Sequence, residues 1–105
     1  MHVARAFVHQ AELDQAIHDI EPALGPDIVR LKYTLGEDWS GESAIFFKIL
    51  LSDRASRRDQ LRKVTAQVTD LIVQRLQPLE QWDVLPYFSF RSESEQAALK
   101  EEAWA

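Results

Sequence analysis

The sequence predicts one small α/β (α+β) domain built on a mixed sheet of about three strands. Three observations carry this prediction: residues 29–35 alternate between apolar and polar, residues 44–51 are almost entirely apolar, and residues 61–76 carry a continuous helical stripe. A chain of 105 residues buries one modest core and leaves no room for a second domain. We therefore expect a single domain over residues 1–105.

The N-terminal half predicts one helix followed by two strands. From Gln10 to Ile20 the apolar residues recur at helical spacing, and a turn rich in proline and glycine follows up to Asp27. The alternation over residues 29–35 predicts a strand with one solvent-facing side. Residues 44–51, AIFFKILL, contain a single charge, which is typical of a central strand covered on both faces.

The longest predicted helix follows the second strand. Ser56 and Asp59 have the three-residue spacing of a capping box, so we expect this helix to begin beside them. Its apolar stripe runs from Leu61 to Leu76 and stops before Pro78. This helix should pack on the sheet.

The aromatic segment 82–90, WDVLPYFSF, predicts the third strand. Pro86 cannot donate a hydrogen bond to a neighbouring strand, so we expect this strand at a sheet edge. Ser92 and Glu95 form a second capping-box pair and predict a short helix to about Ala103. The order is then α-β-β-α-β-α, in which a short loop makes the first two strands antiparallel and a helical crossover makes the last two parallel.

Composition excludes several classes of protein. The chain has no cysteine, so disulfide scaffolds, thiolate zinc sites and thiol nucleophiles are excluded. It has no apolar run of about 18 residues, and its first ten residues lack the apolar stretch of a signal peptide. We expect a cytoplasmic protein without a membrane contact. A net charge of −5 argues against a general nucleic-acid binder.

The positive charge is unevenly distributed along the chain. Five of the twelve cationic residues fall within ten positions, with one acid among them; they are Arg54, Arg57, Arg58, Arg62 and Lys63. On the predicted helix, Arg54, Arg58 and Arg62 would share one face. Such a run is either a solvated face or a contact with an anion, a protein partner or nucleic acid, because the arginine fork suits carboxylates and phosphates.

The C-terminal third supplies further candidate anchors for a partner. Tryptophan and arginine are over-represented among interface hot spots, which selects Trp82, Arg91 and Trp104. The segment from Arg91 onward is acidic and poor in apolar residues, so it docks either on its own sheet through Trp104 or on a partner. The sequence leaves the oligomeric state open.

The loop between the first two strands contains no phosphate-binding motif. Residues 36–43, GEDWSGES, approach the pattern G-x-x-x-x-G-K-[ST], but Glu42 replaces the lysine that contacts phosphate. We expect a simple turn in which Trp39 packs over the end of the sheet. The histidines also lack the spacing of a zinc motif, so we predict neither a cofactor nor a metal site.

The order of elements resembles the minimal nucleotidyltransferase domains of bacteria and archaea, many of which are antitoxin partners of HEPN-type ribonucleases. In that family the second strand carries an Asp-x-Asp pair for magnesium, and the third strand carries another aspartate. Here Ala44 and Phe46 stand at the pair, no serine follows Gly36, and Asp83 falls near the third position. The resemblance implies a nucleotidyltransferase-like fold that has lost its metal site.

These observations predict a non-catalytic protein-binding module of antitoxin or immunity type, and the resemblance implies a HEPN-type toxin as its partner. Two alternatives stay open. The first is a transferase with a divergent metal site made by Glu37, Asp38 or Glu42 together with Asp83. The second is an accessory protein that contacts nucleic acid through the basic run at residues 54–63.

Overall fold

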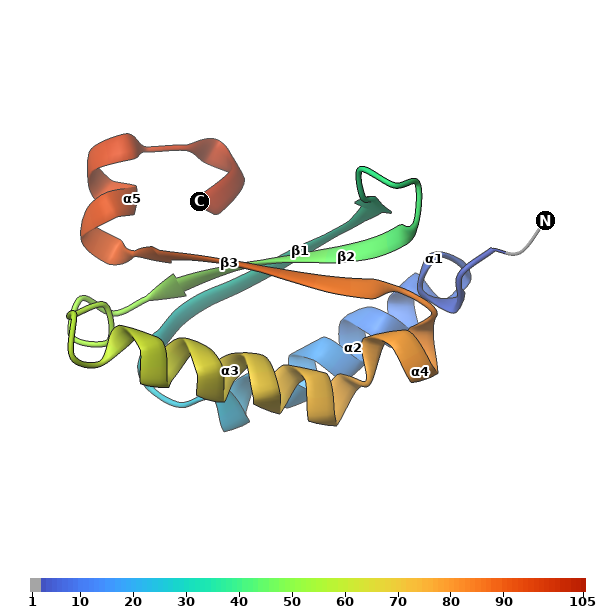
Figure 1. The fold of residues 1–105 in the computed structure, drawn as a ribbon, viewed down its shortest axis with the longest axis horizontal. Coiled ribbons are helices and arrows are strands. Elements are labelled where there is room, and N and C mark those ends of the chain that lie inside the picture. Colours follow the sequence, from blue (N-terminus) through green and yellow to red (C-terminus); the bar gives the residue numbers. More distant parts are fainter. Residues whose placement is uncertain (1–2) are drawn as a thin grey trace.

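The computed structural model describes residues 3–105 and shows a three-stranded sheet with helices along one face (Figure 1). The elements are α1 (Arg5–Val8), α2 (Gln10–Ile20), the 3₁₀ turn η1 (Glu21–Leu24), β1 (Ile28–Glu37), β2 (Ser43–Leu51), α3 (Leu61–Leu76), α4 (Pro78–Trp82), β3 (Leu85–Ser92), α5 (Glu93–Leu99) and the 3₁₀ turn η2 (Glu102–Trp104). The predicted order α-β-β-α-β-α and the α+β class are confirmed, with α1 and α4 as additional short helices. No helix within residues 3–105 combines the length and apolar character needed to cross a membrane.

The sheet has the mixed topology that the sequence predicts. The strand order is β1-β2-β3, so β2 is central and β3 lies at an edge. β1 and β2 are antiparallel and pair Tyr33 with Phe47, whereas β2 and β3 are parallel and pair Phe47 with Phe88. A short hairpin permits only the first arrangement, and the crossover through α3 and α4 permits the second.

The main core lies between the sheet and the pair α2–α3. One side of β2 points inward with fully buried Ile45, Phe47 and Ile49, and the Phe47 ring stacks on Phe88 at a centroid distance of 5.2 Å. Buried residues of α2 and α3 complete the core; they are Leu13, Ile17, Val68, Ile72 and Leu76. The opposite face of the sheet is covered at one end by the C-terminal segment (Figure 1).

The start of the long helix differs from the prediction. α3 begins at Leu61 and has no side-chain cap, so the predicted capping box of Ser56 and Asp59 is wrong. Ser56 is instead used in the preceding turn, where its hydroxyl donates to the carbonyl oxygen of Ser52 at 3.0 Å. Residues 53–60 therefore form a chain of turns, and Arg54 and Arg58 do not share a helical face with Arg62.

The start of the third strand also differs. Trp82 ends α4 rather than opening β3, which begins at Leu85. The residues that separate them reverse the chain: Asp83 has a positive φ of 59° and Val84 is fully buried. By contrast, the capping box of Ser92 and Glu95 is confirmed, and α5 begins directly after the strand.

Candidate partner-binding site

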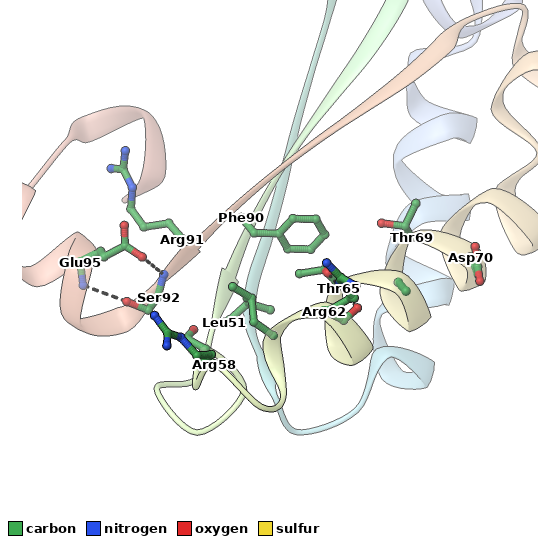
Figure 2. A pocket seen from close by; sticks show the side chains of 13 residues that line it. Leu51, Arg58, Arg62, Thr65, Thr69, Asp70, Phe90, Arg91, Ser92 and Glu95 are labelled. Atoms are coloured by element: carbon green, nitrogen blue, oxygen red, sulfur yellow. Dashed lines mark hydrogen bonds between the residues drawn. The ribbon is translucent and has the colours of Figure 1, made fainter.

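A groove of about 1020 Å³ lies between the first half of α3 and the end of β3 (Figure 2). We call it the α3–β3 groove. Its apolar surface comes from Leu51, Leu61 and Phe90, and the side chains of Arg58 and Arg62 lie along it. Arg91 also borders the groove, but its guanidinium points away toward the C-terminal segment (Figure 2). Thr65 and Thr69 from α3 also line the groove, and so do two carboxylate residues, Asp70 and Glu95. The groove is therefore apolar at its base and carries charges of both signs around it.

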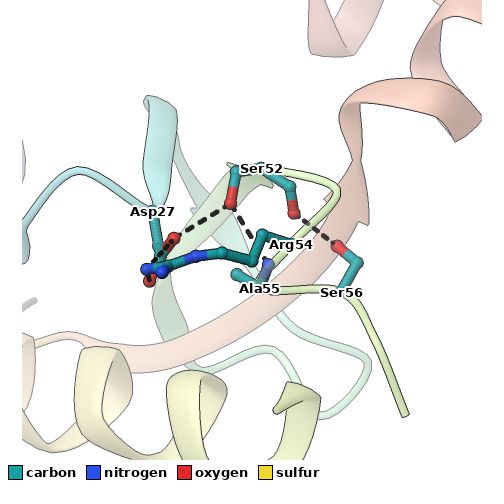
Figure 3. A network of polar contacts seen from close by, with 5 residues as sticks. All are labelled: Asp27, Ser52, Arg54, Ala55 and Ser56. Atoms are coloured by element: carbon teal, nitrogen blue, oxygen red, sulfur yellow. Dashed lines mark hydrogen bonds and ion pairs between the residues drawn. The ribbon is translucent and has the colours of Figure 1, made fainter. Parts of the chain in front are cut away.

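The turn that follows β2 sets the position of one end of this groove (Figure 3). Asp27 precedes β1, and its carboxylate accepts a hydrogen bond from the Ser52 hydroxyl at 3.0 Å. Arg54 Nη2 donates to both oxygens of the same carboxylate, at 3.2 Å each. The Ser52 hydroxyl in turn accepts the Ala55 backbone N–H at 3.2 Å. This network holds the turn against β1, so α3 begins only at Leu61. It also engages the Arg54 guanidinium in an ion pair within the protein.

A second polar network fixes α5 at the same end. Asp53 accepts the backbone N–H of Ser94 at 3.0 Å and its hydroxyl at 2.6 Å, and these bonds hold the pKa of the Asp53 carboxyl below its usual range. The Ser92 hydroxyl accepts the Glu95 N–H at 3.1 Å, and Glu95 Oε1 accepts the Ser92 N–H at 3.3 Å. The end of β3 is thus tied to the turn after β2, and the groove has a defined boundary.

Arg91 joins the groove to the C-terminal segment. Its guanidinium donates to Gln96 Oε1 at 3.1 Å and to Glu101 Oε1 at 3.2 Å. The same group lies 4.5 Å from the centre of the Trp104 ring, an arrangement that stabilises through cation–π attraction. Lys32 Nζ also donates to the carbonyl oxygen of Ala105 at 2.8 Å. Trp104 is buried, so of the two alternatives that the sequence leaves open, this segment docks on its own sheet.

The side chains of Arg58 and Arg62 differ from those of Arg54 and Arg91 in having no hydrogen-bond or ion-pair partner within residues 3–105. Both are exposed. Arg62 also lies in the first turn of α3, where the helix dipole adds positive potential instead of compensating the charge. These two guanidinium groups are therefore available to an external anion or carboxylate.

The structure brings together three of the seven candidate residues. Arg58, Arg62 and Arg91 line the α3–β3 groove, and Trp104 lies against Arg91. Arg54 pairs with Asp27, and Arg57 is exposed in the turn before α3. Trp82 is half-buried in α4, beyond the C-terminal end of α3, and does not line the groove.

The carboxylates of the transferase alternative do not converge. Asp38 accepts hydrogen bonds from the Ser40 hydroxyl at 2.7 Å and from Tyr87 Oη at 2.7 Å, which together lower its pKa to about 2. Asp83 accepts the Arg5 N–H at 3.3 Å. Within residues 3–105 no three histidine, cysteine, aspartate or glutamate side chains form a group that could hold a metal ion.

Trp39 is a surface feature that the sequence interpretation missed. The expected packing over the sheet end is wrong, because 87% of Trp39 is exposed at the tip of the β1–β2 hairpin. Its ring meets Tyr87 edge-on at a centroid distance of 5.8 Å. The sequence carried one usable signal: Asp38 and Ser40 flank Trp39 and are typical of a tight turn, which leaves the intervening side chain outside.

Comparison with known proteins adds no relative to this description. The chain matches no protein-family model, no curated protein and no solved structure.

Proposed function

We propose that this chain is a non-catalytic protein-binding module of antitoxin or immunity type, which regulates or neutralises a partner protein by direct contact. One observation carries the proposal: the α3–β3 groove combines an apolar base with the unpaired guanidinium groups of Arg58 and Arg62. Buried apolar contacts next to arginine side chains are the usual composition of an interface hot spot.

The same groove favours a protein over a nucleic acid as the partner. Leu51, Leu61 and Phe90 give it an apolar base that a phosphate backbone would not use. The chain as a whole carries a net charge of −5, which disfavours a long polyanion more than a short acidic segment, because a nucleic acid would extend beyond the two arginines over acidic surface. An acidic and partly apolar protein surface matches both features of the groove.

The proposal is tested by capture from native cells with three tagged proteins. These are the wild type, the double variant Arg58→Gln/Arg62→Gln, and a matched control that loses two exposed arginines outside the groove, Arg30→Gln/Arg75→Gln. We expect one protein to be recovered with the wild type and the control and to be lost with the groove variant. The recovered protein is then purified and its affinity for each of the three is measured.

A partner that binds all three proteins equally would contradict the assignment of the groove. Recovery that disappears after nuclease treatment would favour the nucleic-acid alternative instead. In that case affinity should fall steeply with salt, because each phosphate contact releases counterions.

A further inference from the structure

We infer that the α3–β3 groove receives an extended, acidic segment of the partner protein, which joins the sheet as a fourth strand beside β3. The inference rests on the proposed function and names the form and chemistry of the contact. Three features of the structure carry it: the open edge of β3, an uncovered face of α3, and the unpaired arginines at the rim.

β3 is an outer strand, so one row of its main-chain groups has no neighbour within the sheet. Pro86 pairs with Ile45 at the start of this strand. Because proline has no N–H, it belongs at a position whose main-chain nitrogen faces away from the sheet. Residues alternate along a strand, so Phe88 and Phe90 direct their N–H and C=O groups to the same open side.

The open edge is poorly protected against pairing. Natural edge strands are commonly blocked by proline, by lysine or by a bulge. Here Pro86 blocks the beginning, whereas residues 87–91 contain neither proline nor lysine and keep a continuous register with β2. This stretch is about 16 Å long at 3.3 Å per residue, which is enough for a strand of five residues.

α3 presents a second face beside this edge. Val68 and Ile72 point into the core, whereas Leu61, Thr65 and Thr69 follow one another at four-residue spacing and line the groove. Leu61 is 40% exposed. A fourth strand would extend the sheet over this face of α3, and its inward side chains would meet Leu61, Phe90 and the threonine methyl groups.

The charges at the rim determine the preferred sequence of that strand. Arg58 and Arg62 lie at the groove without internal partners, so carboxylates on the incoming segment would form new charge-assisted hydrogen bonds. Two carboxylates also line the groove, Glu95, which accepts the Ser92 N–H, and Asp70. Within residues 3–105 neither forms an ion pair with Arg58 or Arg62. A segment that alternates apolar and acidic residues fits both the base of the groove and its rim.

The test uses the full chain and three blocked peptides of about six residues, long enough to span residues 87–91 at 3.3 Å each. The first alternates valine and glutamate. The second replaces glutamate by lysine. The third is the acidic peptide with methyl groups on the amide nitrogens of alternate residues, which removes the strand-pairing donors. Affinity is measured by calorimetry, and hydrogen exchange of single amides is followed by NMR.

We expect the acidic peptide to bind at least about tenfold more tightly than either of the other two, since it alone offers both carboxylates and main-chain donors. Its binding should slow exchange at the Phe88 and Phe90 amides. Arg58→Gln/Arg62→Gln should weaken it by about tenfold, whereas Arg30→Gln/Arg75→Gln should leave it unchanged.

Equal affinity for the methylated peptide, or unchanged exchange in β3, would overturn strand addition. Equal affinity for the lysine peptide would overturn the acidic preference, and so would failure of all three peptides to bind. None of these results affects the proposed function, which is judged separately by capture of the intact partner on the wild type and its loss from the groove variant.

Discussion

The phenol of Tyr87 on β3 donates a hydrogen bond of 2.7 Å to Oδ2 of Asp38 at the tip of the β1–β2 hairpin. The other oxygen of the same carboxylate accepts the backbone N–H groups of Ser40 and Glu42 at 2.9 and 3.0 Å. One carboxylate therefore ties a loop to a strand that is 49 residues away in the sequence. This arrangement fixes the turn that leaves Trp39 87% exposed, with its ring edge-on to Tyr87.

The first prediction concerns acid stability. Hydrogen bonds from Ser40 and Tyr87 lower the pKa of Asp38 from 3.8 to about 2, so the ionised form stabilises the fold. The contribution of this carboxylate to the stability of the fold is complete above about pH 4 and is lost as the pH falls through about 2. We expect Asp38→Asn to melt at a lower temperature than the wild type at neutral pH, with a difference that disappears in strong acid.

The control for this experiment is Glu37→Gln, which changes a neighbouring carboxylate without a hydrogen-bond partner among residues 3–105. Its melting temperature should follow the wild type across the titration. A constant difference between Asp38→Asn and the wild type from neutral pH to strong acid would mean that the charge of Asp38 is not the cause.

The second prediction concerns alkaline titration. Burial, followed by the 3.0 Å hydrogen bond to Asp14 and its negative charge, raises the pKa of Tyr33 to about 12. The neutral phenol is favoured in the fold, so this stabilisation is full below about pH 10 and is lost as the pH rises through about 12. The ultraviolet absorbance of tyrosinate should show a late transition that Tyr33→Phe removes.

Asp14→Asn separates the causes of this shift. It removes the charge of Asp14, which should bring the Tyr33 transition to lower pH while leaving it above the ordinary value, because burial is the largest cause. A transition that stays at the wild-type pH would show that Asp14 has no part in it.

The third prediction concerns the core. Phe47 is 1% exposed and stacks on Phe88 across the parallel pair β2–β3. Phe47→Ala should reduce the free energy of unfolding by about 3–5 kcal/mol, the usual cost of a phenylalanine cavity, and a domain of this size could lose its fold. Denaturant unfolding measures the loss. Leu79→Ala, at a side chain that is 54% exposed, should cost no more than about 0.5 kcal/mol.

The fourth prediction compares arginines of one basic run. Arg54 forms an ion pair of 3.2 Å with Asp27 at a largely exposed site, so Arg54→Gln should reduce stability by up to about 1 kcal/mol. Arg58→Gln/Arg62→Gln removes no internal pair and should stay within about 0.5 kcal/mol of the wild type. A larger loss in the double variant than in Arg54→Gln would show that these arginines support the fold rather than a partner.

Much of the fold follows from the sequence alone, because the relevant signals are local. The helical spacing from Gln10 to Ile20 predicts α2 with its observed bounds, and the apolar run at residues 44–51 identifies the central strand. Pro86 predicts an edge position for the third strand, and the pair Ser92 and Glu95 predicts the start of α5. Each of these signals acts within a few residues of the structure that it determines.

The tertiary structure decided where α3 begins and which arginines lie at the groove. Ser56 and Asp59 fit a capping box locally, but Ser52 and Arg54 bind Asp27, which is at least 25 residues away in the sequence, and this keeps the chain in turns up to Leu61. The same long-range contacts pair the Arg54 guanidinium with Asp27, whereas the guanidinium groups of Arg58 and Arg62 have no ion-pair partner within residues 3–105. No local pattern distinguishes these arginines, because an ion pair depends on which distant carboxylate the fold brings within reach.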